Sequence, residues 1–382
     1  MSEKPASPAI SPSDSGFLDE MRRTADPLAD GLLAAIFARR EAALINTLLQ
    51  ALDGNSEALP EGLPPDVGAY LASVQLPPWA DRARIERAQR LFLRHGPAFG
   101  VALMLSSLPS LYAGAFGGAQ ILAMTGQLTK NFRRRASETL RFILDAMEPG
   151  GLDEGGKGLR STQKVRMMHA SIRQFALHGT AWKDHPDWGA PINQEELAGT
   201  LMAFSIVALD GLEKLGIEVE KEDKEAYFHA WKCIGFVLGI DPNALPADLQ
   251  EGEKLWKAVG RRNFRPTPEA LQLMAAHLEF VKEMLPGHTA DGMVESLMRY
   301  LMGKKIACGI LGLPKASWTD FFIGWIRALL LLERLWIFNG RGMKALIRAI
   351  SEDLMESLQT YWSDGGPPPF RIPTSVAGAR PG

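Results

Sequence analysis

Two apolar segments of the chain carry polar side chains at spacings that place them on shared helix faces. In the first segment, Arg135 and Thr139 are four residues apart. In the second, His169 follows Arg166 by three residues and precedes Arg173 by four. Residues three and four apart lie on one face of an α-helix, so each set projects in a common direction. The local pattern alone favours a hydrogen-bonded core histidine whose arginine neighbours form ion pairs.

A haem site is the other interpretation of these residues. A haem iron needs a single imidazole from the protein, an apolar slot for the porphyrin and cations for the propionates. Helices rich in Leu, Met and Phe with a few arginines supply all of these, with His169 as the iron ligand. An ordinary metal site needs more than one such ligand. The spacing of the polar residues leaves both interpretations open.

Longer motifs extend this pattern. The stretch Val165–Arg173 is followed by a second block that runs from Pro191 to Leu212. Both resemble the signature segments of the latex-clearing-protein and MpaB-type oxygenases. Further matches occur in the family's order, so the resemblance covers about residues 76–318; they are Leu76–Trp79, Tyr112–Ala113, Leu122–Gly126, Tyr227–Gly235 and Leu311–Pro314.

The resemblance implies a b-type haem within an enlarged globin-like core of helices. Such proteins activate dioxygen and oxidatively cleave carbon–carbon double bonds of isoprenoid chains. His169 matches the proximal haem ligand of the family, which is the residue that binds the haem iron. Arg135 and Thr139 match its pocket arginine and threonine, and Arg166 matches the arginine one helical turn before the ligand. His229 matches a histidine of the pocket region and is included among the haem-binding residues.

The chain departs from the rubber-cleaving members at two catalytic positions. Those members carry Lys just before the pocket threonine, where this chain has Glu138. They also carry a distal Glu, for which the spacing here offers Ala119 or Gln120. Glu138 is able to replace the missing base, whereas Gln120 can hydrogen-bond to oxygen but cannot abstract a proton near neutral pH. We therefore expect polyisoprene itself to be a poor substrate.

Three hypotheses of function follow. The first is a haem-dependent oxygenase that acts with dioxygen on an apolar, unsaturated, isoprenoid-like small molecule. The second is a haem- or gas-binding protein without oxygenase activity, which the missing Lys and Glu keep open. The third is a helical protein that binds apolar ligands without haem. A haem absorption band separates the third hypothesis from the first two, and oxygen uptake with an alkene separates the first from the second.

The elements that position these residues are predicted to be helices throughout. The chain has 382 residues, of which 46% are hydrophobic and 23% charged, which suits a globular protein with a large core. Apolar residues recur with helical spacing, and no alternation typical of strands interrupts them. We expect a single all-α domain over residues 17–364 between a disordered leader, 1–16, and a disordered tail, 365–382. Its helices are predicted at Phe17–Leu52, Asp81–His95, Lys130–Met147, Lys157–His178, Asn193–Leu215, Glu222–Leu238, Ala247–Gly260, Pro268–Met284, Val294–Leu311 and Trp318–Phe338.

Charge and hydropathy bear on partners and location. The net charge of −2 predicts no nucleic-acid partner, and two cysteines are too few for a disulfide framework. The leader lacks the features of a signal peptide, so a cytoplasmic location is expected. No charged residue occurs from Gly96 to Thr129, but seven Pro and Gly residues interrupt that segment. We therefore predict a buried core segment that lines an apolar cavity rather than a membrane span, with peripheral membrane contact left open.

Overall fold

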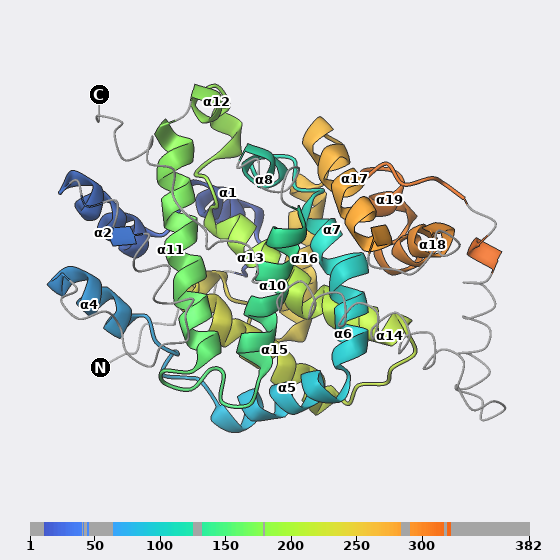
Figure 1. Ribbon diagram of the computed structural model, residues 1–382, viewed down its shortest axis with the longest axis horizontal. Helices are drawn as coiled ribbons and strands as arrows, with labels where there is room; N and C mark the ends of the chain where they lie inside the picture. Colours follow the sequence, from blue (N-terminus) through green and yellow to red (C-terminus); the bar gives the residue numbers. More distant parts are fainter. Residues whose placement is uncertain are drawn as a thin grey trace, which may run out of the picture.

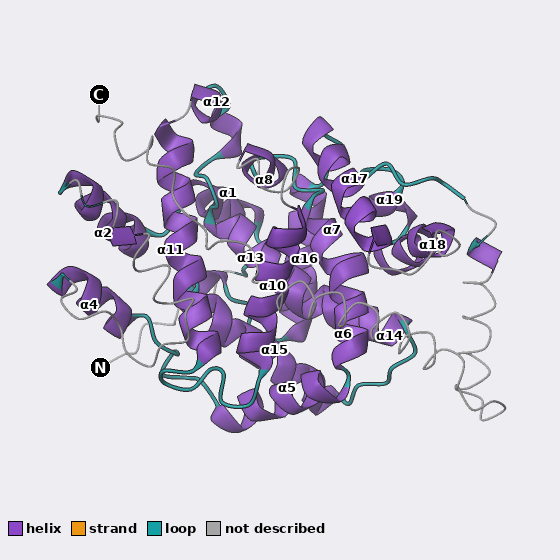
Figure 2. Cartoon of the chain, in the orientation of Figure 1, coloured by secondary structure: helices purple, strands orange, loops and turns teal. Residues whose placement is uncertain are grey.

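The computed structural model describes residues 11–39, 41, 44–45, 64–124, 132–178, 180–283, 291–316 and 319–321. Within these ranges the regular elements are all helices (Figures 1 and 2). One isolated bridge joins Gly114 to Phe264. The predicted all-α fold is confirmed, whereas residues 1–10 and the predicted tail 365–382 lie outside the described residues.

Helices follow one another along the described parts of the chain. They are α1 (Ser15–Arg23), α2 (Pro27–Ala38), α4 (Pro65–Ser73), α5 (Arg82–Arg94), α6 (Gly96–Ala102), η1 (Leu103–Ser107), α7 (Leu108–Leu111), α8 (Gly118–Met124), α10 (Phe132–Met147), α11 (Lys157–His178), α12 (Thr180–Lys183), η2 (Pro186–Trp188), α13 (Gln194–Met202), η3 (Ala203–Val207), α14 (Ala208–Lys214), α15 (Lys221–Val237), η4 (Pro242–Ala244), α16 (Leu249–Asn263), α17 (Pro268–Glu283), α18 (Asp291–Met302) and α19 (Lys304–Ala307). Helix α11 has the bounds that the sequence predicts.

Aspartate and asparagine side chains fix where several helices begin. Asp81 accepts hydrogen bonds from the backbone N–H groups of Ala83 and Arg84, and Asp248 accepts one from Glu251. At the start of α13, Asn193 caps the N–H of Glu196. Each cap satisfies a donor that the first turn of a helix leaves unpaired. The cap at Asn193 also sets which faces of α13 point into the core.

The chain between residues 15 and 38 forms two helices, not the single long helix predicted from Phe17 onwards. Helix α1 ends at Arg23, and α2 begins at Pro27 with Asp26 as its N-cap. Proline fixes a backbone angle suited to the first turn of a helix and has no N–H to donate to a preceding turn. The break is therefore local in origin. It turns Asp26 and Asp30 toward α11.

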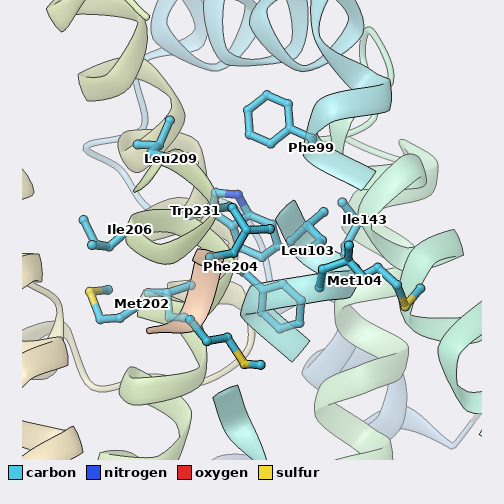
Figure 3. Close-up of a cluster of buried hydrophobic side chains, with 14 of the residues drawn as sticks. Phe99, Leu103, Met104, Ile143, Met202, Phe204, Ile206, Leu209 and Trp231 are labelled. Atoms are coloured by element: carbon cyan, nitrogen blue, oxygen red, sulfur yellow. The ribbon is translucent and has the colours of Figure 1, made fainter. Parts of the chain in front are cut away.

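Helices α10 and α11 pack side by side near the centre of the molecule, and α15 contacts both α11 and α13 (Figure 1). The main core cluster joins α10, α13 and α15 to the segment from Phe99 to Leu105. Figure 3 shows Phe204 and Trp231 within it, near Leu103 and Met104. The Phe204 and Trp231 rings are stacked, with centroids 5.2 Å apart. Most of this core is aliphatic or aromatic, so its stability derives mainly from apolar burial.

The uncharged segment from Gly96 onwards lies in the core, as predicted, up to Met124, where the described part ends. It forms α6, the π-helical turn η1, α7 and α8, and most of its side chains are buried. Among the described residues, no single helix is long and apolar enough to cross a membrane. One pair, Arg82–Arg94 with Gly96–Leu111, passes that test together by length and composition, with a bend of 85° between its halves.

Buried ion pairs join α2 to α11. Arg166 donates to both carboxylate oxygens of Asp26, at 2.6 Å and 2.8 Å, and to the carbonyl oxygen of Val237. Arg173, whose side chain is 1% exposed, donates to Asp30 at 2.7 Å. The predicted haem-binding role of Arg166 is therefore not supported, because all three guanidinium nitrogens are bonded within the protein. Both arginines form ion pairs with carboxylates, as the local sequence pattern predicted.

We predict that Asp26→Asn lowers the free energy of unfolding by about 3 kcal/mol, because it leaves buried guanidinium charge without its carboxylate. The amide keeps an oxygen for the cap at Ala29, so the loss reports the ion pair rather than the cap. Urea denaturation measures the change. Asp153→Asn, which removes an exposed pair with Arg82, is the control and should change stability far less. Equal effects of the two variants would contradict the assignment.

Candidate active site

Two adjoining cavities lie where α10, α11 and α13 meet. Their volumes are about 190 Å³ and about 210 Å³. Six residues line both cavities and so form their common wall: Leu111, Leu122, Arg135, His169, Leu197 and Thr200. The predicted lining by the uncharged segment is confirmed, because Leu108, Leu111 and Leu122 belong to it. His169 and Arg135 are the titratable members of this common wall.

His169 is enclosed by protein and has no hydrogen-bonded partner among the described residues at Nδ1. Burial lowers the pKa of His169 to about 3, and the positive charges of Arg173 and Arg135 act in the same direction. The ring is therefore neutral at physiological pH. A neutral imidazole is the form that binds a metal ion. An enclosed polar nitrogen without a partner is uncommon in a folded core and points to a ligand.

Arg135, Glu138 and Thr139 lie together on α10, as predicted, and line the second cavity. Arg135 and Glu138 form an ion pair at 3.6 Å. The Thr139 hydroxyl donates to the Arg135 carbonyl oxygen at 2.9 Å. Its proton is thus used within the helix, and the hydroxyl oxygen can act as an acceptor toward the cavity.

Gln120 and His229 do not line either cavity. Gln120 accepts from the Gly117 N–H and donates to Glu269. Nε2 of His229 accepts from the Asp81 N–H at 2.9 Å, and its ring meets Trp79 edge to face. His229 therefore links α15 to the start of α5. The structure therefore does not bring these two predicted site residues to the wall that carries His169.

A chain of hydrogen bonds that the sequence did not predict holds the Tyr112 side chain in the wall of the second cavity. In η1, the Leu108 N–H bonds to Leu103, and Pro109 has no N–H, so the Met104 carbonyl lacks a helical donor. Nε2 of His277 donates to that carbonyl at 2.7 Å. Nδ1 must then accept, and the Tyr112 hydroxyl lies 3.0 Å away. Burial lowers the pKa of His277 to about 4, so this neutral tautomer persists.

The first cavity ends in a buried polar network centred on Glu195. That carboxylate accepts from Arg22 at 2.8 Å, from Arg262 at 2.9 Å and from Asn263 at 3.0 Å. The neighbouring Glu196 lines the cavity, and its Oε1 has no hydrogen-bond partner among the described residues. Burial raises the pKa of Glu196 to about 8. The sequence contained one signal for the position of these two glutamates. The N-cap at Asn193 places both of them in the first turn of α13.

The residues present fit a haem in three respects. His169 offers a neutral, enclosed imidazole on the wall shared by both cavities. The surrounding side chains are mainly apolar, as a porphyrin requires. Arg135 supplies a cation in the same wall for a propionate. Arg166 and His229, which the sequence added to this set, are engaged elsewhere.

Comparison with known proteins gives concordant results. A model of the family described as ER-bound oxygenase mpaB/B'/Rubber oxygenase, catalytic domain, matches residues 89–334. A rubber oxygenase from Streptomyces sp. (strain K30) is 25% identical over 370 residues, covering 94% of this chain and 88% of that protein. A solved structure of a latex clearing protein, LCP, in the closed state matches with a TM-score of 0.74 at 24% identity, over 88% of this chain and 91% of that chain. The resemblance inferred from the motifs is confirmed.

We predict that Gly117→Ala lowers the free energy of unfolding by about 1–3 kcal/mol, because Gly117 has a φ of +102° that non-glycine residues rarely adopt. A Cβ atom there would also lie 2.8 Å from Oε1 of Glu196 and 3.1 Å from the Trp182 ring. Urea denaturation tests this. Gly118→Ala is the matched control, since its Cβ would lie 3.9 Å from Glu196. A neutral effect of Gly117→Ala would contradict the close contact.

Proposed function

The chain belongs to the ER-bound oxygenase mpaB/B'/rubber oxygenase catalytic-domain family, and from this premise we propose that it is a haem b-dependent oxygenase. Its substrate is proposed to be an unsaturated isoprenoid or similar apolar chain, whose double bond it cleaves with dioxygen. The observation that carries the proposal is His169: an enclosed neutral imidazole, unpartnered at Nδ1, on the wall between two largely apolar cavities. A histidine that only packs in the core or pairs with a charged group would not need an unpartnered ring nitrogen beside two cavities.

In this proposal His169 holds the iron and Arg135 neutralises a propionate. When bound, the haem supplies the dioxygen chemistry, which the amino-acid side chains cannot supply themselves. A charge-assisted bond from a guanidinium to a buried carboxylate contributes about 1.5–3 kcal/mol. The Glu138 carboxylate forms an ion pair with Arg135 and so helps to position the guanidinium. These residues therefore bind and position the cofactor.

The walls of the second cavity bind and shield the chain that is cleaved. Phe204 and Trp231 form a stacked aromatic surface there, and Phe132 and Phe142 line it as well. Burial of an alkene chain against such walls contributes about 25 cal/mol per Å² of apolar surface. The Tyr112 hydroxyl, fixed by His277, supplies an oriented polar group in the same wall. Water exclusion and orientation are thus the tasks of the side chains.

We predict that His169→Ala abolishes haem retention, because b-type haem has no covalent tether and would be held to the protein through the His169 imidazole. The measurement is the absorption spectrum of protein purified from haem-supplemented cells, with haem and protein quantified separately. The wild type should show a Soret band at a ratio near one haem per chain.

His229→Ala is the control for this experiment, because His229 lies outside both cavities. It should keep its haem while losing some stability through the broken contact with Asp81. A wild-type protein without a Soret band would leave an apolar-ligand-binding protein as the surviving hypothesis. Haem retained without oxygen uptake on an alkene would favour the non-catalytic haem protein.

We predict that farnesyl or geranyl alkenes are cleaved and that polyisoprene latex is a poor substrate. The reason is Glu138, which lines the second cavity where the rubber-cleaving members carry Lys. The similar Streptomyces protein is named a rubber oxygenase, so latex is the necessary comparison substrate. Product analysis under oxygen decides the matter. Efficient cleavage of latex with no turnover of the short chains would show that this substrate assignment is wrong.

A further inference from the structure

Glu196 is a buried carboxyl group to which the proposed mechanism gives no task. It lies in the first turn of α13 and lines the first cavity, on whose wall His169 also lies. Its Oε1 atom is enclosed and has no hydrogen-bond partner among the described residues. A carboxyl oxygen in this position is costly unless something in the cavity bonds to it.

The cations near Glu196 are already matched by other groups. Arg22 donates through Nε to Glu195, through Nη1 to the Phe116 carbonyl and through Nη2 to Asn263. Arg262 divides its bonds among Glu195, Ser15 and Asp19. The two arginines are therefore balanced by the two carboxylates of Glu195 and Asp19. An ionised Glu196 would add a negative charge that neither of these two arginines, already bonded to other carboxylates, would fully neutralise.

The protonation of Glu196 follows from this balance. Burial raises the pKa of Glu196 to about 8, and the negative charge of Glu195 acts in the same direction. Arg22 and the capping bonds of Asn193 act against it but do not outweigh burial. The other charged or titratable groups around the cavity are Arg135 and His169, and Gln120 is the polar side chain at the adjacent end of α8. Below about pH 8 the carboxyl is neutral and carries an O–H donor.

We propose that Glu196 is the hydrogen-bond donor of the first cavity and selects apolar chains that bear a neutral oxygen acceptor, such as an aldehyde or ketone. A site that contains a buried donor discriminates against ligands unable to pair with it, because the donor is then left without a partner. A carboxylate ligand is disfavoured, since Arg22, the arginine that lines the cavity beside Glu196, already donates to Glu195. Oxidative cleavage of a double bond produces two carbonyl ends, so the site suits chains that have already been cleaved once.

This inference rests on the proposed function, because it assumes that the cavities receive an isoprenoid chain. Three probes of one skeleton separate the two ideas: farnesal with a carbonyl, farnesene with no oxygen, and farnesoate with a carboxylate. Binding to the full chain is measured by isothermal titration calorimetry without oxygen, so turnover does not enter. At pH 7 the wild type should bind farnesal about tenfold more tightly than farnesene, and farnesoate more weakly than farnesal.

Two substitutions at Glu196 test the role of the donor. Glu196→Leu should abolish the preference for farnesal while leaving farnesene bound. Glu196→Gln keeps a neutral donor, so it should keep the preference and hold it above pH 8, where the wild type loses it as the carboxyl ionises. Glu269→Gln is the control, because Glu269 contacts Gln120 but lines neither cavity. It should behave as the wild type does.

An infrared difference spectrum provides a readout that does not depend on any ligand. The wild type minus Glu196→Gln should show the carbonyl band of a protonated carboxylic acid at pH 7, and its absence would overturn the proposal. Equal binding of farnesal and farnesene, or a preference that survives Glu196→Leu, would also overturn it while leaving the oxygenase proposal intact. Tighter binding of farnesoate would assign recognition to Arg22 instead. If no probe binds, both proposals fail.

Discussion

Buried arginine–carboxylate pairs between the N-terminal segment and the central helices fix the walls of the site. Arg22 bonds to Glu195 on α13, while Asp26 and Asp30 bond to Arg166 and Arg173 on α11. The segment from residue 22 to residue 30 thus joins the helix that carries His169 to the helix that carries Glu196. Removing one member of such a pair leaves a buried charge, so these contacts resist any sliding of α11 against α13.

These ion pairs mainly determine how the helices are placed relative to one another. They add little to the stability of the fold, because replacing a buried pair with apolar residues is often neutral for stability. The apolar core supplies the stability, and apolar contacts alone permit small shifts of helix register. Bonds that are both charged and directional do not. Arg166 meets Asp26 through two parallel bonds, a geometry that a displacement of one helical turn would abolish. The spacing between the imidazole of His169 and the opposite wall depends on this register.

Features that depend on the local periodicity of apolar residues could be predicted from the sequence. Helical spacing of apolar residues predicts α11 with its observed bounds, and it predicts that Arg135 and Thr139 share a face with each other. The motifs around His169 lead to the correct family. The resemblance also assigned Arg166 to the haem, but one turn along the same helix its side chain meets a different neighbour. Its partner, Asp26, is 140 residues distant in the chain, and no short-range pattern connects the two.

Other features depend on tertiary contacts that periodicity does not encode. His229 matches a family position, yet its bond to Asp81 depends on how α15 packs against α5. The link between His277 and Tyr112 depends on a π-helical turn and on Pro109, whose missing N–H leaves a carbonyl to be satisfied across the core. Glu196 stands beside Glu195 in the sequence, but only the structure shows that Glu195 takes both arginines. Adjacent glutamates therefore have opposite environments.

Burial acts on the titratable groups around the cavities in one consistent direction, toward the neutral form. It lowers the pKa of His169 and His277 and raises the pKa of Glu196 and Tyr112. Charge is kept where it is matched: Arg135 with Glu138, and Arg22 with Glu195. Neutral walls lower the cost of bringing an uncharged, apolar chain out of water. The burial that keeps His169 neutral, as its proposed role as an iron ligand requires, thus also favours neutral chains as ligands of the site.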